Sequence, residues 1–127
     1  MVRKAGKVVV PGDVNVWPHE YQTAQVLARA GFTVEFIRKS DIPRQTSADA
    51  YIDGIKWEMK APKSSKLSAV EDNLKKALHQ SPYIIFDSRR MKRLPDKAIE
   101  RELTTQFHKS KEIQRILFVN RHANICV

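Results

Sequence analysis

Asp53-Gly54 is the feature that most constrains how this chain can fold. This dipeptide favours a two-residue type I′ turn, and alternating apolar and polar residues flank it on both sides. Residues 48–60 therefore predict a β-hairpin in which Ile52 pairs with Ile55 and side chains alternate between two faces. The apolar face carries Ala48, Ala50, Ile52, Ile55, Trp57 and Met59, and the polar face carries Asp49, Tyr51, Lys56, Glu58 and Lys60.

The segments around the hairpin alternate between strand and helix patterns. Pro18 suits the first turn of a helix and Gly31 suits its end, and apolar residues recur at helical spacing from Leu67 onward. We expect an α/β fold with a mixed central sheet flanked by helices, formed as one domain over residues 1–127. Expected strands lie at 8–10, 33–37, 83–87 and 116–119, and expected helices lie at 18–30, 65–80 and 95–109.

The charge balance indicates a polyanionic partner. Lys and Arg number 23 against 14 Asp and Glu, which gives a net charge of +9. Such a domain is attracted to nucleic acid, an anionic membrane surface or an acidic protein. No apolar run is long enough for a membrane span, and the start of the chain lacks the apolar stretch of a signal peptide. The single cysteine, Cys126, excludes an intrachain disulfide and a cysteine zinc cluster.

The polar face of the hairpin places two carboxylates opposite each other. In the predicted register Asp49 faces Glu58, with β-carbons roughly 4.5–5.5 Å apart. Like charges at this separation destabilise a sheet unless a cation lies between them, and a divalent metal ion prefers such oxygen ligands. Lys60 projects from the same face, so the set suits metal-dependent phosphodiester hydrolysis. The alternative is a solvated polar face on which Lys56 and Lys60 neutralise the acids.

Glu20 is a third candidate acid. It shares helical spacing with Ala24 and Leu27, which indicates a carboxylate on the buried face of helix 18–30. It is either a further metal ligand or a first-turn acid that the helix N-terminus stabilises.

Together these residues resemble the PD-(D/E)XK nuclease superfamily, in which a helix with a glutamate precedes a hairpin carrying Asp and Glu-x-Lys. The stretch 49–90 is similar to the C-terminal nuclease domains of contact-dependent growth inhibition toxins, notably the branch that cleaves tRNA. The similarity is carried by Trp57–Lys63, by the helix at Asn73–Leu78 and by the strand at Ile84–Asp87. Ala48 departs from the pattern, because the superfamily often has proline there.

The resemblance implies a metal-dependent nuclease with tRNA as the favoured substrate. Glu20, Asp49 and Glu58 match the acidic metal ligands, and Lys60 matches the catalytic lysine. The expected cofactor is Mg²⁺, with Mn²⁺ or Zn²⁺ as alternatives. The resemblance further implies delivery from a larger secreted or cell-surface protein, action in the cytoplasm of a target bacterial cell, and an acidic immunity protein as partner.

Basic residues near the expected site are candidates for nucleic-acid contact; the alternative for any one basic run is a solvated loop, and the net charge of +9 favours contact. Other functions stay open at this point: a metal-dependent DNase, a non-catalytic nucleic-acid-binding module, and a metal-free RNase using His19 and Glu20. Both tryptophans, Trp17 and Trp57, are expected in the core, and Tyr51 is the better candidate for base stacking. The basic candidates are Lys63, Lys66, Lys75, Lys76, Arg89 and Arg90.

Overall fold

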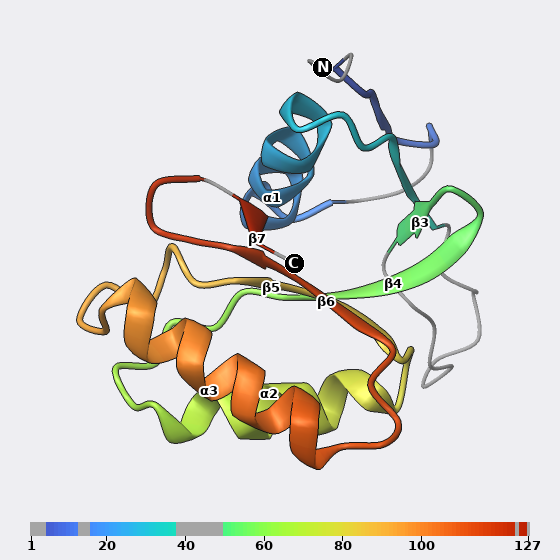
Figure 1. Ribbon diagram of the computed structural model, residues 1–127. Helices are drawn as coiled ribbons and strands as arrows, with labels where there is room; N and C mark the ends of the chain where they lie inside the picture. The colour runs from blue at the N-terminus through green and yellow to red at the C-terminus, as the bar shows by residue number, and fades with distance from the viewer. Residues whose placement is uncertain (1–4, 13–15, 38–49, 124, 127) are drawn as a thin grey trace.

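The computed structural model describes residues 5–12, 16–37, 50–123 and 125–126, and within them seven strands form one mixed sheet (Figure 1). The order of the strands across the sheet follows their order in the chain. The strands are β1 (Val8–Val9), β2 (Val34–Phe36), β3 (Ala50–Ile52), β4 (Ile55–Lys60), β5 (Tyr83–Asp87), β6 (Arg115–Val119) and β7 (Ile125–Cys126). The helices are α1 (Pro18–Arg29), α2 (Ser68–Leu78) and α3 (Asp96–Lys109).

The β3-β4 hairpin has the predicted register. Ile52 pairs with Ile55 and Ala50 pairs with Trp57. Asp53 and Gly54 have φ angles of 52° and 78°, the left-handed conformations that a type I′ turn requires. Aspartate tolerates this region better than most residues and glycine has no side chain to clash, so the local sequence fixes the turn.

Strands β4, β5 and β6 run parallel to one another, whereas β3 and β7 are antiparallel to their neighbours β4 and β6. The carboxyl ends of β4, β5 and β6 therefore meet at one edge of the sheet. Helices α2 and α3 form the connections β4-α2-β5 and β5-α3-β6 that parallel strands need. This carboxyl edge is where open α/β sheets commonly place their functional groups.

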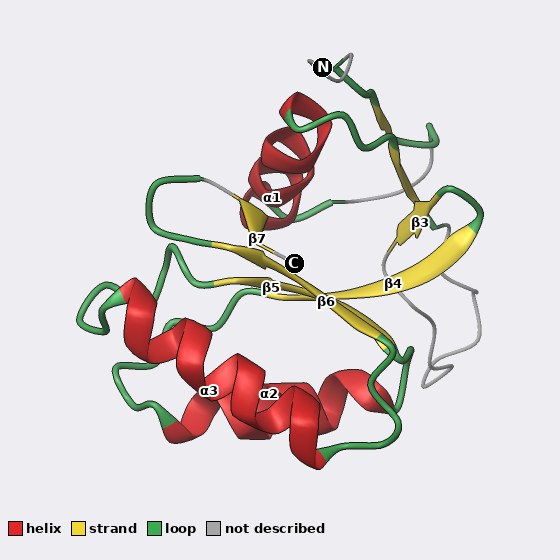
Figure 2. Ribbon diagram, in the orientation of Figure 1, coloured by secondary structure: helices red, strands yellow, loops and turns green. Residues whose placement is uncertain are grey.

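The helices cover both faces of the sheet. Helix α1 lies on one face, and α2 and α3 lie side by side on the other (Figure 2). The core beneath α1 includes Leu27, Trp57 and Met59, and the core beneath α2 and α3 includes Leu74 and Phe86. Alternate residues of the central strands enter opposite cores, so the sheet is buried on both sides.

The expected mixed α/β fold is confirmed, and the expected helices and strands are present with bounds that differ by no more than three residues. The short strand β7 was not predicted. The prediction that Trp17 and Ile55 are buried in the core is wrong. Trp17 is 67% exposed because it precedes α1, and Ile55 is 40% exposed because it adjoins the turn. Trp57, by contrast, is buried as expected. None of the helices in the described part of the chain is long and apolar enough to cross a membrane.

Candidate functional site

Strand β4 places Glu58 and Lys60 on the same face of the sheet. Trp57 and Met59 point into the core beneath α1, so the residues that alternate with them point toward α2 and α3. The Lys60 ammonium nitrogen lies 3.5 Å from Glu58 Oε2. Both residues stand near the carboxyl edge, and Lys60 is the last residue of β4.

The Glu58 carboxylate is buried, whereas the Lys60 side chain reaches the surface. Glu58 is only 6% exposed, whereas 24% of the Lys60 side chain reaches solvent. A carboxylate removed from water needs positive charge or hydrogen-bond donors nearby, and Lys60 supplies positive charge. The alternative interpretation, a polar face exposed to solvent, is therefore wrong for Glu58. The carboxylate of such a pair can bind a cation, and its ammonium group can stabilise negative charge on a phosphate.

Asp49 lies outside the described residues, so its predicted position opposite Glu58 stays a prediction. The observed pairing of Ala50 with Trp57 is the register on which that prediction rests. Among the residues that the structure describes, no group of three or more His, Cys, Asp or Glu side chains is placed to hold a metal ion.

The structure does not bring Glu20 together with Glu58 and Lys60. Glu20 belongs to the first turn of α1, and its Oε1 accepts a hydrogen bond of 3.1 Å from the backbone N–H of Trp17. Helix α1 covers the opposite face of the sheet from the Glu58–Lys60 pair. This geometry is that of a capping acid, which satisfies a backbone donor at the helix start.

Two substitutions separate the capping role of Glu20 from the predicted metal-ligand role. Glu20→Gln keeps an oxygen that can accept from Trp17 but removes the negative charge, so we expect nearly unchanged stability and unchanged cleavage. Glu20→Ala removes the cap and lowers the free energy of unfolding by about 1 kcal/mol. Urea denaturation and Mg²⁺-dependent cleavage are measured on both variants. Loss of cleavage in Glu20→Gln with normal stability would restore Glu20 to the ligand set.

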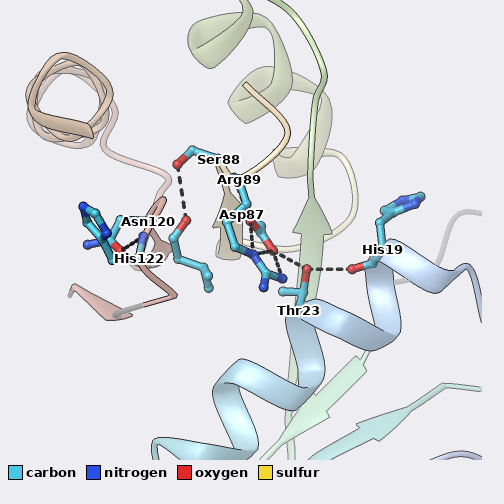
Figure 3. Close-up of polar contacts among 8 residues, drawn as sticks. His19, Thr23, Asp87, Ser88, Arg89, Asn120 and His122 are labelled. Carbon is cyan, nitrogen blue, oxygen red and sulfur yellow. Dashed lines mark hydrogen bonds and ion pairs between the residues drawn. The ribbon is translucent and has the colours of Figure 1, made fainter. Parts of the chain in front are cut away.

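A second polar cluster, which sequence reasoning missed, lies at the carboxyl end of β5 (Figure 3). Asp87 is 3% exposed, and its carboxylate accepts three hydrogen bonds from the Arg89 guanidinium, the shortest at 2.7 Å from Nη2. The Thr23 hydroxyl of α1 lies 2.6 Å from Asp87 Oδ2 and 2.9 Å from the His19 carbonyl oxygen, so its single proton serves two acceptors. This cluster ties α1 to the edge of the sheet.

The Asp87 cluster changes the expected role of Arg89. The sequence predicted Arg89 as a nucleic-acid contact, whereas the structure pairs its guanidinium with a buried carboxylate. The available signal was an aspartate that ends an apolar strand and precedes an arginine by two residues. A carboxylate buried in that position requires a partner, and Arg89 is close enough in the chain to provide one.

The predicted lysine contacts occupy exposed positions. Lys63 and Lys66 lie between β4 and α2, and Lys76 is exposed on α2. Lys75 forms an ion pair of 2.9 Å with Glu71, one helical turn before it. The hydrogen bond and charge of Lys75 lower the pKa of Glu71, and the same contacts raise the pKa of Lys75. Arg90, the remaining predicted basic contact, is half-buried, in contrast to these exposed lysines.

A surface cavity of about 460 Å³ lies between α3 and β6, with Leu103, Phe107, Arg115 and Phe118 among the residues that line it. Glu58, Lys60 and Asp87 are not part of its lining. The cavity is therefore a feature separate from both polar clusters.

Comparison with known proteins identifies the family. Residues 46–125 match the family model described as the contact-dependent growth inhibition CdiA C-terminal domain. A solved structure described as the CdiA-CT/CdiI toxin and immunity complex from Burkholderia pseudomallei has a TM-score of 0.72 at 17% identity, over 95% of this chain and 97% of that chain. No sequence among curated proteins gave a significant match. Because the family model covers more than half of the sequence, the chain belongs to the CdiA C-terminal domain family and is a toxin domain of contact-dependent growth inhibition.

Proposed function

We propose that this toxin domain is a metal-dependent nuclease of the PD-(D/E)XK type. The observation that carries the proposal is the buried Glu58 carboxylate paired with Lys60 on one face of β4. The pair has the Glu-x-Lys spacing of that superfamily and ends at the carboxyl edge of the parallel strands. Asp49 completes the proposed catalytic set.

The donor chemistry of this site fits a divalent cation. Glu58 provides a buried carboxylate, and Asp49 would provide a second one; Mg²⁺ and Mn²⁺ prefer such oxygen ligands, whereas Zn²⁺ accepts them beside nitrogen and sulfur. A metal ion bound there would supply Lewis-acid activation of the phosphodiester and of a water molecule. Lys60 is the group of this chain that would stabilise the negative charge developing on the phosphate.

The proposed substrate is nucleic acid, with tRNA favoured. The net charge of +9 supports a polyanionic substrate, and exposed Lys63 and Lys66 follow β4 directly where a phosphate backbone would approach. The preference for tRNA rests on the resemblance of stretch 49–90 to the tRNA-cleaving branch. A DNase of the same fold is the alternative, because charge does not distinguish RNA from DNA.

An immunity protein is the proposed protein partner. The similar structure from Burkholderia pseudomallei is described as a toxin and immunity complex, which supports a cognate inhibitor for this chain. An acidic inhibitor would complement the basic surface and associate rapidly with it. We propose that the domain is delivered from a larger cell-surface protein and acts in the cytoplasm of the target cell.

Cleavage of purified tRNA and plasmid DNA, each with Mg²⁺ and with EDTA, tests the proposed function. We expect the native protein to cleave tRNA only with Mg²⁺ and Asp49→Ala to have lost this activity. Cleavage of DNA alone would replace the tRNA proposal with the DNase alternative. RNA cleavage that survives both EDTA and Asp49→Ala would contradict the metal-dependent proposal and direct attention to His19.

A further inference from the structure

Three aromatic or imidazole rings gather at the start of α1. Trp17 is 67% exposed, Tyr21 is 41% exposed, and the Trp17 and His19 rings are stacked with centroids 6.4 Å apart and an interplanar angle of 19°. A single exposed aromatic residue is ordinary on a protein surface. A stacked pair with a large open ring face is a more specific feature, because one indole face remains available to another flat group.

Two hydrogen bonds hold the backbone of Trp17 in place, one at its N–H and one at its carbonyl oxygen. Its N–H donates to Glu20 Oε1 at 3.1 Å, and its carbonyl accepts from the Tyr21 N–H at 3.0 Å in the first turn of α1. Pro18 follows it and restricts the chain further. A ring on a fixed backbone loses little conformational freedom when it binds a ligand, so the position is organised in advance for contact.

The first turn of α1 is connected to residues 89–93, the basic segment that follows β5. The His19 carbonyl oxygen and the Asp87 carboxylate share the proton of the Thr23 hydroxyl, and Arg89 binds that carboxylate (Figure 3). Four basic residues of this segment follow Asp87 within six positions: Arg89, Arg90, Lys92 and Arg93. Lys60 pairs with Phe86, the residue before Asp87, so the proposed catalytic strand ends at the same edge.

We propose that the Trp17–His19 ring pair is a stacking platform for an unpaired base of single-stranded nucleic acid. This inference rests on the proposed nuclease function and specifies the form of its substrate. Base-paired nucleotides stack on one another and do not present their faces to protein, whereas an unpaired base stacks on an aromatic side chain regardless of its identity. The net charge of +9, and the basic segment after β5 that the Asp87 cluster joins to α1, favour a polyanion over an apolar protein partner.

Fluorescence titration in EDTA tests the platform without cleavage. The chain has two tryptophans; Trp57 is 3% exposed, so quenching by a bound base reports on Trp17. The probes are a short oligoadenylate, its duplex with oligouridylate, and polyglutamate. We expect oligoadenylate to quench the emission, and the duplex and polyglutamate to have little effect at equal charge.

Substitutions give the matched comparison. Because Trp17→Ala and Trp17→Phe lack the reporter indole, their affinities and that of the native protein are measured by the fluorescence anisotropy of a dye-labelled oligoadenylate. We expect Trp17→Ala to weaken oligoadenylate binding by roughly 5- to 150-fold, the range for loss of one stacked base, while Trp17→Phe retains most of the affinity. Phe107→Ala is the control, because Phe107 is an exposed aromatic residue on α3 that lines the cavity separate from both polar clusters. Its oligoadenylate affinity should equal that of the native protein.

The outcomes separate this inference from the nuclease proposal. Unchanged oligoadenylate affinity in Trp17→Ala, together with intact Mg²⁺-dependent cleavage, would remove the platform and leave the nuclease in place. If polyglutamate quenches the emission as strongly as oligoadenylate does, the proposed stacking platform is rejected and the surface is instead a binding site for an acidic protein. Failure of the native protein to bind oligoadenylate, with Mg²⁺-dependent cleavage of tRNA intact, would overturn the platform alone, whereas loss of both would contradict both proposals.

Discussion

Lys60→Met is expected to lower Mg²⁺-dependent cleavage by about 10²- to 10³-fold, the typical effect of removing one group that stabilises transition-state charge. Methionine keeps an unbranched side chain of similar length but lacks the ammonium group that lies beside Glu58. The effect should fall on the maximal rate more than on substrate affinity, because the charge to be stabilised develops during the reaction. Initial rates over a range of substrate concentrations measure this difference.

Lys63→Met is the matched control for Lys60→Met. It removes the same charge three residues later, at an exposed position, and should weaken substrate binding only a few-fold through the loss of one phosphate contact. Because Lys60→Met also leaves Glu58 with less positive charge nearby, its thermal unfolding is measured and the assay is run well below the midpoint. Equal losses of maximal rate in both folded variants would show that Lys60 contributes only to the general positive charge.

Arg89→Ala is expected to lower the free energy of unfolding by about 3 kcal/mol. This value is at the lower end of the range for breaking a buried ion pair, because Arg89 is partly exposed while Asp87 is almost completely buried. The substitution leaves a carboxylate in the sheet edge without its cation. For a chain of this size the midpoint of thermal unfolding should fall by about 12 °C, measured by circular dichroism.

Arg90→Ala provides the control for Arg89→Ala, because it removes the same charge from the next position. We expect a much smaller stability change there. A double-mutant cycle with Asp87→Ala isolates the pairing energy of Asp87 with Arg89, and the double variant should be more stable than the sum of the single losses predicts. Strict additivity of the two losses would contradict the ion pair as the source of stability.

The hairpin was the part of the fold most open to prediction. Asp53 and Gly54 accept positive φ angles at little cost, and a two-residue turn then sets every pair along β3 and β4. The prediction that Glu58 and Lys60 share a face follows from the alternation of side chains along β4 alone. Local backbone chemistry determined these features, so one sequence was enough to predict them.

Trp17 and Glu20 show where sequence reasoning fails. Helical spacing predicts which residues share a side of α1, but not which face of the sheet the helix covers. Glu20 was therefore expected beside Glu58, although it lies on α1 and binds the Trp17 backbone. Tryptophan is usually well buried, yet Trp17 precedes the first turn and lies outside the core that the helix forms.

The Asp87–Arg89 pair was missed for a different reason. The strand Tyr83–Asp87 was predicted correctly, but its last residue was treated as the end of an apolar run. Whether a carboxylate at that point is buried depends on α1, which begins more than sixty residues earlier and supplies the Thr23 hydroxyl. Long-range packing of this kind leaves no periodic signal in the sequence.

The strand order of the sheet has a kinetic consequence. Each of the seven described strands pairs only with strands adjacent to it in the chain, so every closure spans one turn, loop or helical connection. The entropic cost of closing such loops grows only slowly with their length, and connections do not have to pass through one another. The β3-β4 hairpin can nucleate first and the sheet can grow outward from it in both directions. We therefore expect the sheet to refold by successive local additions of strands to the central hairpin, without long-range pairing of distant segments.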